Sequence, residues 1–143
     1  MSTSNKPASG GYQADSPRFD RPLSPHLQIY SPLVNMMMSI IHRITGVALY
    51  VGTLLLAYYL VSAASGPVAY YHAKWIFGKP IVLVILFGYT WALFHHMLGG
   101  IRHLIWDTGY GLEPETANRL AWATLIGSVG LTLVVWIIGY AVR

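Results

Sequence analysis

Three long apolar runs, separated by short polar stretches, dominate the chain after its first third. They occupy residues 44–64, 80–101 and 120–141, and each is flanked by Lys or Arg. A bilayer core about 30 Å thick needs roughly 20 helical residues, so each run is long enough to span it. Lipid cannot satisfy open backbone groups, and the runs do not alternate as barrel strands do. The pattern predicts an all-α membrane protein, a bundle of three transmembrane helices.

The ends of these spans follow from the flanking residues. With their flanks, the spans cover about 33–64, 77–104 and 117–141 in a membrane anchor domain of residues 21–143. Pro22, Pro25 and Pro32 disfavour continuous helix before about Leu33, and the first helix is expected to start between Pro32 and Asn35. Residues 1–20 are rich in Ser, Pro, Gly and Ala, without the apolar core of a signal peptide, which predicts a flexible polar tail.

Composition supports the membrane assignment and narrows the chemistry. Of 143 residues, 55% are hydrophobic and 10% are charged, whereas a soluble domain carries about a quarter charged residues. The absence of cysteine excludes disulfides, thiol nucleophiles, zinc–thiolate sites and ordinary iron–sulfur clusters. No Gly-rich dinucleotide or phosphate loop follows a strand. A redox cofactor would therefore be held by histidine or supplied by a partner chain.

The net charge of +4 is a topology signal, because the basic residues are scattered singly and form no nucleic-acid-binding patch. Six of the nine basic residues lie on the amino-terminal side of the membrane, which predicts a cytoplasmic or matrix amino terminus. These six are Lys6, Arg18, Arg21, Arg43, Arg102 and Arg119, against Lys74, Lys79 and Arg143 on the opposite side.

Residues 94–103, FHHMLGGIRH, place histidine and glycine inside the second span. A helical stripe joins Tyr89, Ala92, His96, Gly99 or Gly100, and His103. His96 lies roughly 9 Å along the helix from Arg102, too deep for easy contact with water, while His95 points about 100° away. A buried histidine is more often a hydrogen-bonded packing residue than a metal ligand, and small residues are common at helix contacts. The stripe alone leaves both readings open.

A second polar cluster lies near the start of the first span. Ser39, His42 and Arg43 share one helical face. His42 and Arg43 could simply extend to the headgroups while Ser39 packs. Alternatively, the cluster forms a polar pocket for an apolar ligand with a carbonyl, or for a carboxylate at the membrane edge. Because alternating spans bring both clusters to the same membrane face, we expect them to share one site.

The strings RPLSPHLQIY, SIIHRITGVAL and HHMLGGIRHLIWDTGYGL resemble the cytochrome b subunit of succinate dehydrogenase, the larger membrane anchor of respiratory complex II. The resemblance runs from about Arg21 to Leu112, and the third span is similar only in hydropathy. Two motifs carry it, S-x-x-H-R-x-[ST]-G and H-x-x-x-x-G-I-R-H-x-x-W-D. They are specific in combination, order and membrane placement.

The resemblance implies roles for particular residues. His96, seven residues before His103, would be an axial ligand of haem b, with the second ligand on the smaller anchor subunit. Ser39, Ile40 and Arg43 would line the ubiquinone pocket, and His42 and Arg43 would lie near the haem propionates. The other histidines would reach the interface, and Arg102 would end the span there. Gly99 stands where family members often carry a larger residue.

The family also implies the surrounding machinery. A flavoprotein subunit would oxidise succinate, and an iron–sulfur subunit would pass electrons to ubiquinone in a bacterial or mitochondrial inner membrane. This chain would hold neither flavin nor iron–sulfur cluster, and would anchor the complex, ligate haem and form one wall of the quinone pocket. Two alternatives remain: the anchor of a quinol:fumarate reductase, and a structural membrane protein without haem.

Overall fold

Four helices make up the described part of the chain, residues 33–142, in a computed structural model. They are α1 (Val34–Ala64), α2 (Pro67–Phe77), α3 (Pro80–Asp107) and α4 (Pro114–Ala141), and this part contains no strand. Three of them, α1, α3 and α4, are long and apolar enough to cross a membrane, which confirms the predicted three-span, all-α fold. The predicted tail at residues 1–20 lies outside the described residues.

Proline and glycine set the helix boundaries. Pro67, Pro80 and Pro114 each stand in the first turn of a helix, where the missing N–H costs nothing and the fixed φ suits the helix. Gly66, which precedes α2, has a φ of +112°, a conformation that strongly favours glycine. The chain therefore turns sharply after α1.

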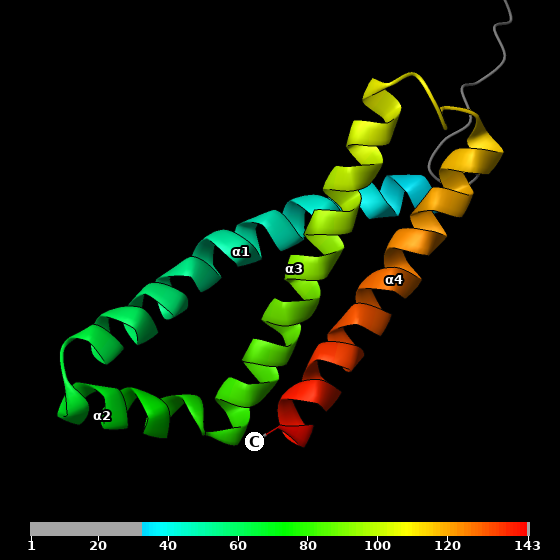
Figure 1. Cartoon of the computed structure of the whole chain (residues 1–143). Coiled ribbons are helices and arrows are strands. Elements are labelled where there is room, and N and C mark those ends of the chain that lie inside the picture. Colours follow the sequence, from blue (N-terminus) through cyan, green and yellow to red (C-terminus); the bar gives the residue numbers. More distant parts are fainter. Residues whose placement is uncertain (1–32, 143) are drawn as a thin grey trace, which may run out of the picture. The chain divides into compact units, whose positions relative to one another are not determined.

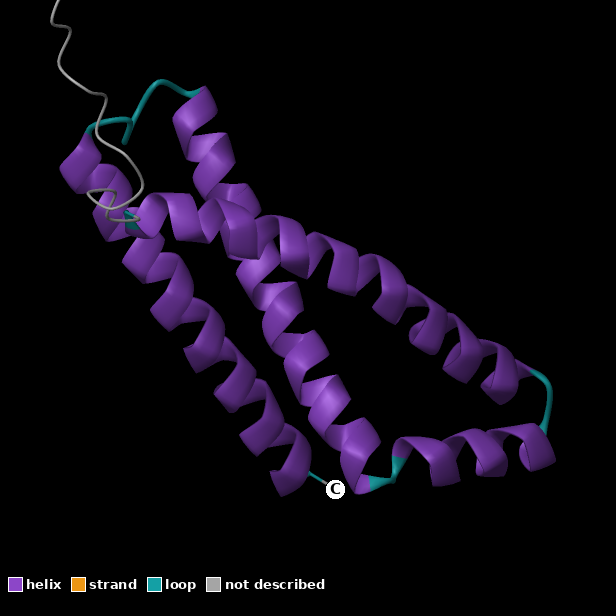
Figure 2. Cartoon of the chain, turned by 180° about the vertical axis from the view of Figure 1, so that it is seen from behind, coloured by secondary structure: helices purple, strands orange, loops and turns teal. Residues whose placement is uncertain are grey.

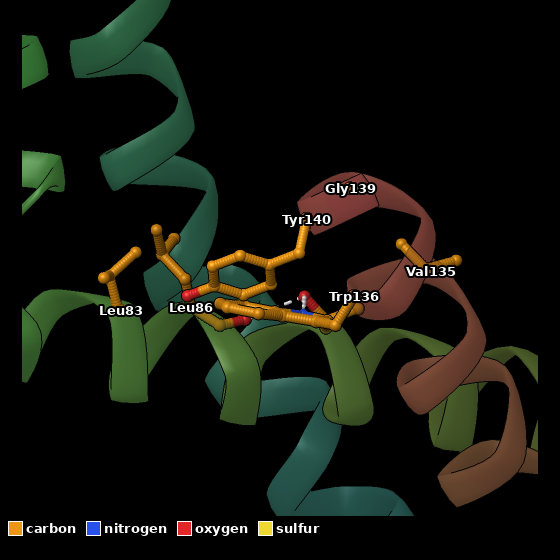
Figure 3. Close-up of a pocket in the computed structure, with 7 residues that line it drawn as sticks. Leu83, Leu86, Val135, Trp136, Gly139 and Tyr140 are labelled. Carbon is orange, nitrogen blue, oxygen red and sulfur yellow. Dashed lines mark hydrogen bonds between the residues drawn. The ribbon is translucent and has the colours of Figure 1, made fainter. Parts of the chain in front are cut away.

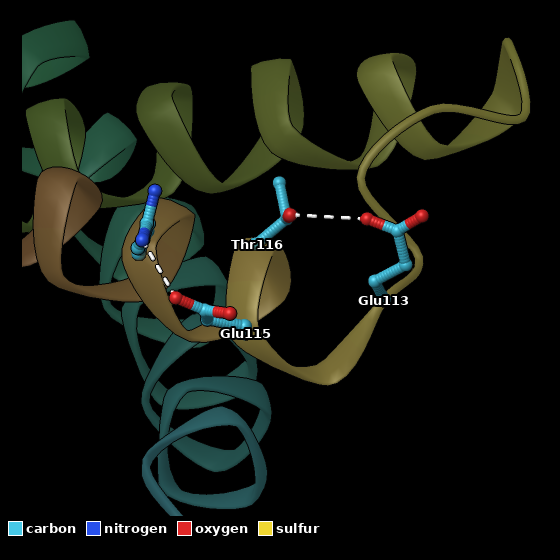
Figure 4. Close-up of polar contacts among 4 residues, drawn as sticks. Glu113, Glu115 and Thr116 are labelled. Atoms are coloured by element: carbon cyan, nitrogen blue, oxygen red, sulfur yellow. Dashed lines mark hydrogen bonds and ion pairs between the residues drawn. The ribbon is translucent and has the colours of Figure 1, made fainter.

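The start of α4 carries the one ion pair of the described residues. Glu115 accepts a hydrogen bond from the Arg119 guanidinium at 2.6 Å, and both side chains are exposed. At the same helix start, the Thr116 hydroxyl donates to the Glu113 carboxylate at 3.3 Å (Figure 4). The two carboxylates lie beside the positive end of the helix dipole, which favours a helix start here.

Helix α2 was not predicted from the sequence, which suggested only a connection between spans. With 11 residues it is too short to cross a bilayer, and it joins the end of α1 to the start of α3 (Figure 1). The Tyr59 ring of α1 packs edge-on against Phe77, with centroids 5.2 Å apart. Lys79 Nζ lies 3.6 Å from the centroid of the Trp75 ring. Aromatic and Lys side chains of this kind are typical of the membrane–water interface.

The long helices pack through small residues and turn large apolar ones outward. The side of α4 that is buried consists of Ala117, Ala121, Thr124, Ser128 and Thr132. Helix α3 lies between α4 on one side and α1 on the other, and α1 crosses α3 and diverges from it towards α2 (Figures 1 and 2). Many Leu, Ile and Val side chains are exposed. This inversion is expected where lipid is the solvent, because close backbone packing then holds the helices together.

Candidate functional site

His96 meets His42 where α1 crosses α3. The two imidazole rings are stacked, with centroids 3.9 Å apart and planes within 5° of each other. Glycines on both helices make this approach possible. A Cβ atom on Gly46 would lie 3.0 Å from His96 Cε1, and one on Gly99 would lie 2.5 Å from His42 Nδ1. The predicted meeting of the two clusters therefore holds for His42, His96 and Gly99.

The hydrogen bonds of His96 fix the position of its proton. His96 Nδ1 lies 3.1 Å from the backbone carbonyl oxygen of His42. A carbonyl only accepts, so Nδ1 must carry the hydrogen and donate it. The Thr45 hydroxyl donates to the same carbonyl at 2.9 Å and lies 3.4 Å from Nδ1. Neutral His96 then keeps its lone pair on Nε2, the nitrogen free to bind an electron-poor partner.

His95 is held on the opposite side of α3, against α4. Its side chain is 1% exposed, and its Nδ1 lies 3.4 Å from Ser128 Oγ. Because the Ser128 hydroxyl donates to the Leu125 carbonyl, its oxygen can accept from His95. The expectation that histidines other than His96 reach the membrane interface is therefore wrong for His95. It is a packing histidine of the α3–α4 contact, which supports the choice of His96 over its neighbour.

The remaining members of the first cluster lie on the outer surface of α1. Ser39, Ile40 and Arg43 are all exposed, Ile40 to 49%. Ser39 and Arg43 make no hydrogen bond or ion pair with another described residue. They share a face as predicted, within one helical turn of His42, but the described chain does not enclose them.

Sequence reasoning assigned no role to Thr45 or Gly46, although both stand in the quoted S-x-x-H-R-x-[ST]-G motif. Thr45 is 2% exposed and bonds the carbonyl that holds His96, while Gly46 lies against the His96 ring. The Thr-Gly pair at the end of the motif was the sequence feature that could have pointed to these two residues. Its function depends on the crossing of α1 over α3.

A cavity of about 400 Å³ lies elsewhere, between the start of α3 and the end of α4 (Figure 3). None of the predicted site residues lines it. Its walls are mostly apolar, and the Trp136 indole N–H is already bonded to the Thr90 hydroxyl at 3.2 Å. Its lining residues are Leu83, Leu86, Thr90, Val135, Trp136, Gly139 and Tyr140.

The described residues offer few side chains for a metal ion. The described residues contain no group of three or more His, Cys, Asp or Glu side chains able to hold a metal ion. Among them, His96 is the histidine whose ring is oriented by a hydrogen bond to a backbone carbonyl, and its Nε2 makes no hydrogen bond to a described residue.

Comparison with known proteins gives a consistent result. Residues 17–135 match the family described as the succinate dehydrogenase/fumarate reductase transmembrane subunit, so the similarity extends into the third span, beyond the stretch that the motifs covered. The succinate dehydrogenase cytochrome b556 subunit of Paracoccus denitrificans is 44% identical over 87% of this chain and 96% of its own length. The Rickettsia conorii protein of the same name is 37% identical over 82% of this chain and 91% of its own length. The mitochondrial cytochrome b560 subunit of succinate dehydrogenase from Bos taurus is 36% identical over 78% of this chain and 70% of its own length.

Proposed function

Because the chain belongs to the succinate dehydrogenase/fumarate reductase transmembrane subunit family, we propose that it is the cytochrome b anchor of a succinate:ubiquinone oxidoreductase. The three relatives described above are all named as succinate dehydrogenase subunits, which favours succinate oxidation over fumarate reduction. Succinate oxidation itself would occur on partner subunits.

The observation that carries the proposal is the hydrogen bond from His96 Nδ1 to the His42 carbonyl, 3.1 Å long. An axial haem histidine typically donates its second ring N–H in this way, which orients the ring and raises the basicity of the ligating nitrogen. We infer that His96 Nε2 ligates the iron of haem b. The haem would supply one-electron redox chemistry.

The residues around His96 fit a haem shared between two chains. Of the described histidines, only His96 bonds a backbone carbonyl through its ring, and the second axial ligand would come from the smaller anchor subunit. Gly46 lets the His96 ring lie against α1, and Gly99 lets the His42 ring lie against α3, while His96 stays partly exposed. His42 Nδ1 is buried against Gly99 without a hydrogen-bond partner. Its other nitrogen, Nε2, is left to donate to a haem propionate, as Arg43 also could.

The exposed face of α1 is suited to one wall of a ubiquinone pocket. The Ser39 hydroxyl, which has no partner among the described residues, can donate to a quinone carbonyl. The Arg43 guanidinium can stabilise negative charge that builds on the ring during reduction, where low dielectric makes such charge costly. Ile40, 49% exposed, offers apolar contact between them. The other walls would come from the iron–sulfur subunit and the smaller anchor.

This proposed function implies which partner subunits the chain binds and how it is oriented in the membrane. The chain has no cysteine to ligate an iron–sulfur cluster and no Gly-rich dinucleotide loop to hold a flavin, so a flavoprotein subunit and an iron–sulfur subunit would carry these groups. These would dock on the cytoplasmic side of a bacterial inner membrane, or the matrix side in mitochondria, where the charge bias puts the amino terminus.

The test is purification through a tag on this chain. The complex should contain the flavoprotein, the iron–sulfur subunit and the smaller anchor, should show the sharp visible band of reduced haem b, and should reduce ubiquinone with succinate. Fumarate reduction by quinol that clearly exceeds succinate oxidation would favour the fumarate reductase alternative. Absence of haem and of partner subunits would contradict the proposal.

A further inference from the structure

Arg102 is a buried cation without a counter-charge. Its side chain is 3% exposed, and its guanidinium Nε and Nη1 are fully buried without a hydrogen-bond partner. The ion pair found among the described residues, Arg119–Glu115, does not include Arg102. An isolated charge in apolar surroundings is costly unless an anion meets it. Sequence reasoning placed this arginine at the membrane interface, where water would have satisfied it.

A small hollow between α3 and α4 adjoins the guanidinium. Its volume is about 150 Å³, and apart from Arg102 its walls are Leu98, Ile101, Ile105, Leu120, Ala123 and Thr124. The Thr124 hydroxyl donates to the Leu120 carbonyl, so its hydrogen is already committed. Trp106 holds the cation in place, with its ring centroid 5.1 Å from Arg102 Cζ. Arg102 is therefore the donor in a hollow whose other walls are largely aliphatic.

Along α3, Arg102 lies at the edge of the hydrocarbon core, where a long side chain can still reach a lipid headgroup. A helix of 28 residues is roughly 42 Å long, which exceeds a hydrocarbon core of about 30 Å by roughly 6 Å at each end. Arg102 lies five residues before the end of α3 at Asp107, or roughly 7.5 Å inside it. Ile101, one of the lining residues, is 46% exposed, so the hollow adjoins the outer apolar surface of the described helices.

We propose that Arg102 binds the phosphate of a membrane phospholipid, one acyl chain of which lies along the aliphatic walls of the α3–α4 hollow. A guanidinium matches phosphate oxygens with two parallel hydrogen bonds. Basic pockets between transmembrane helices on the cytoplasmic side are suited to anionic headgroups. Arg102 lies on the α4 side of α3, as His95 does, and it is none of the residues assigned to the haem or the quinone, so the lipid site is tested separately from those assignments.

Photo-crosslinking of the intact complex tests the proposal. Two probes with identical photoreactive acyl chains are compared, phosphatidylglycerol and diacylglycerol, which lacks the phosphate. In the wild-type complex, phosphatidylglycerol should label peptides from residues 98–105 and 120–124 well above diacylglycerol. Arg102→Gln should lower this labelling about ten-fold, the scale of a lost charge-assisted hydrogen bond. The matched control Arg119→Gln removes a charge from the same side of the membrane and should leave the labelling unchanged.

The alternatives give distinct results. Equal labelling by the two probes in the wild type would overturn the proposal, and would point to a carboxylate of a partner subunit as the counter-charge. Suppression of labelling by millimolar inorganic phosphate would overturn it in favour of a free anion. If Arg102→Gln fails to assemble, Arg102→Lys keeps the charge without the planar fork, and its labelling should fall between zero and the wild-type value. The comparison of the two probes in the wild type decides the question without any variant.

Discussion

The imidazoles of His42 and His96 lie parallel across the α1–α3 crossing, 3.9 Å apart, and the backbone carbonyl of the same His42 accepts from His96 Nδ1. One residue of α1 thus restrains the His96 ring in two ways, through its side chain and through its main chain. The restraint leaves His96 Nε2 as the nitrogen available to a ligand. The orientation of this ring should therefore depend on how closely α1 approaches α3.

The glycines at the crossing should be intolerant of even one methyl group. Gly99→Ala would put a Cβ atom 2.5 Å from His42 Nδ1, and Gly46→Ala would put one 3.0 Å from His96 Cε1. Overpacking of this kind costs about 1–3 kcal/mol. We expect both variants to lower the thermal stability and the haem content of the purified complex, Gly99→Ala more strongly. Gly130→Ala adds the same methyl where no atom lies within 4 Å and should behave as the wild type. Equal behaviour of all three would mean that the crossing is looser than described.

Much of this arrangement could be predicted from the sequence. Hydropathy located the three spans, and helical spacing correctly separated His95 from His96 by about 100°, which here puts one against α4 and the other against α1. The functions of Thr45 and Gly46 could not be predicted, because they arise only where two helices cross. The burial of Arg102 could not be predicted, because its position along the helix says nothing about the neighbouring α4.

Helix α2 escaped prediction for a different reason. Its 11 residues mix Tyr, Trp and Lys with small side chains, so neither apolar length nor a clean polar face marks it. The boundary signals were present: Gly66–Pro67 at its start and Gly78–Lys79–Pro80 after its end. These residues can be recognised as the ends of a helix only after the two flanking transmembrane spans have been identified.

Thr45 should affect how firmly His96 holds the haem and the midpoint potential of the haem. Thr45→Val keeps the shape of the side chain but removes the hydroxyl that bonds the His42 carbonyl and lies 3.4 Å from His96 Nδ1. Partners of this kind typically change ligand affinity about ten-fold or more, so haem should be retained less firmly and its midpoint potential should shift. Thr53→Val removes a comparable hydroxyl–carbonyl bond on the exposed side of α1 and should leave both unchanged. An unaltered potential and haem content in Thr45→Val would remove Thr45 from the site.

Ser39 and Arg43 should matter for quinone reduction and not for succinate oxidation. Loss of one hydrogen bond involving a charged group costs about 1.5–3 kcal/mol, or roughly ten- to a hundred-fold. Ser39→Ala should slow quinone turnover by something approaching that scale, and Arg43→Ala should slow it further because it removes a fixed charge. Succinate oxidation with a water-soluble acceptor, which takes electrons before the membrane site, should be nearly unchanged. Equal losses in both assays would indicate failed assembly, and the quinone-site assignment would then be abandoned.

The chain should be unstable without its smaller partner. Helix contacts in lipid rely on packing and bound cofactor, and the second haem ligand would come from the other anchor. Expression of this subunit alone should yield little haem-loaded protein, measured as haem per polypeptide after purification. A stable, fully loaded product would contradict the shared haem and would point to His42 and His96 as an internal ligand pair.

The visible spectrum of the reduced complex tests the central claim, that His96 and not His95 ligates the haem. His96→Ala should change or abolish the low-spin haem spectrum. His95→Ala, which removes a packing histidine bonded to Ser128, should leave the spectrum mostly intact even if stability falls. Assembly is checked in both variants by subunit content and by succinate oxidation with a soluble acceptor. Loss of the haem spectrum in His95→Ala with its retention in His96→Ala would contradict the account.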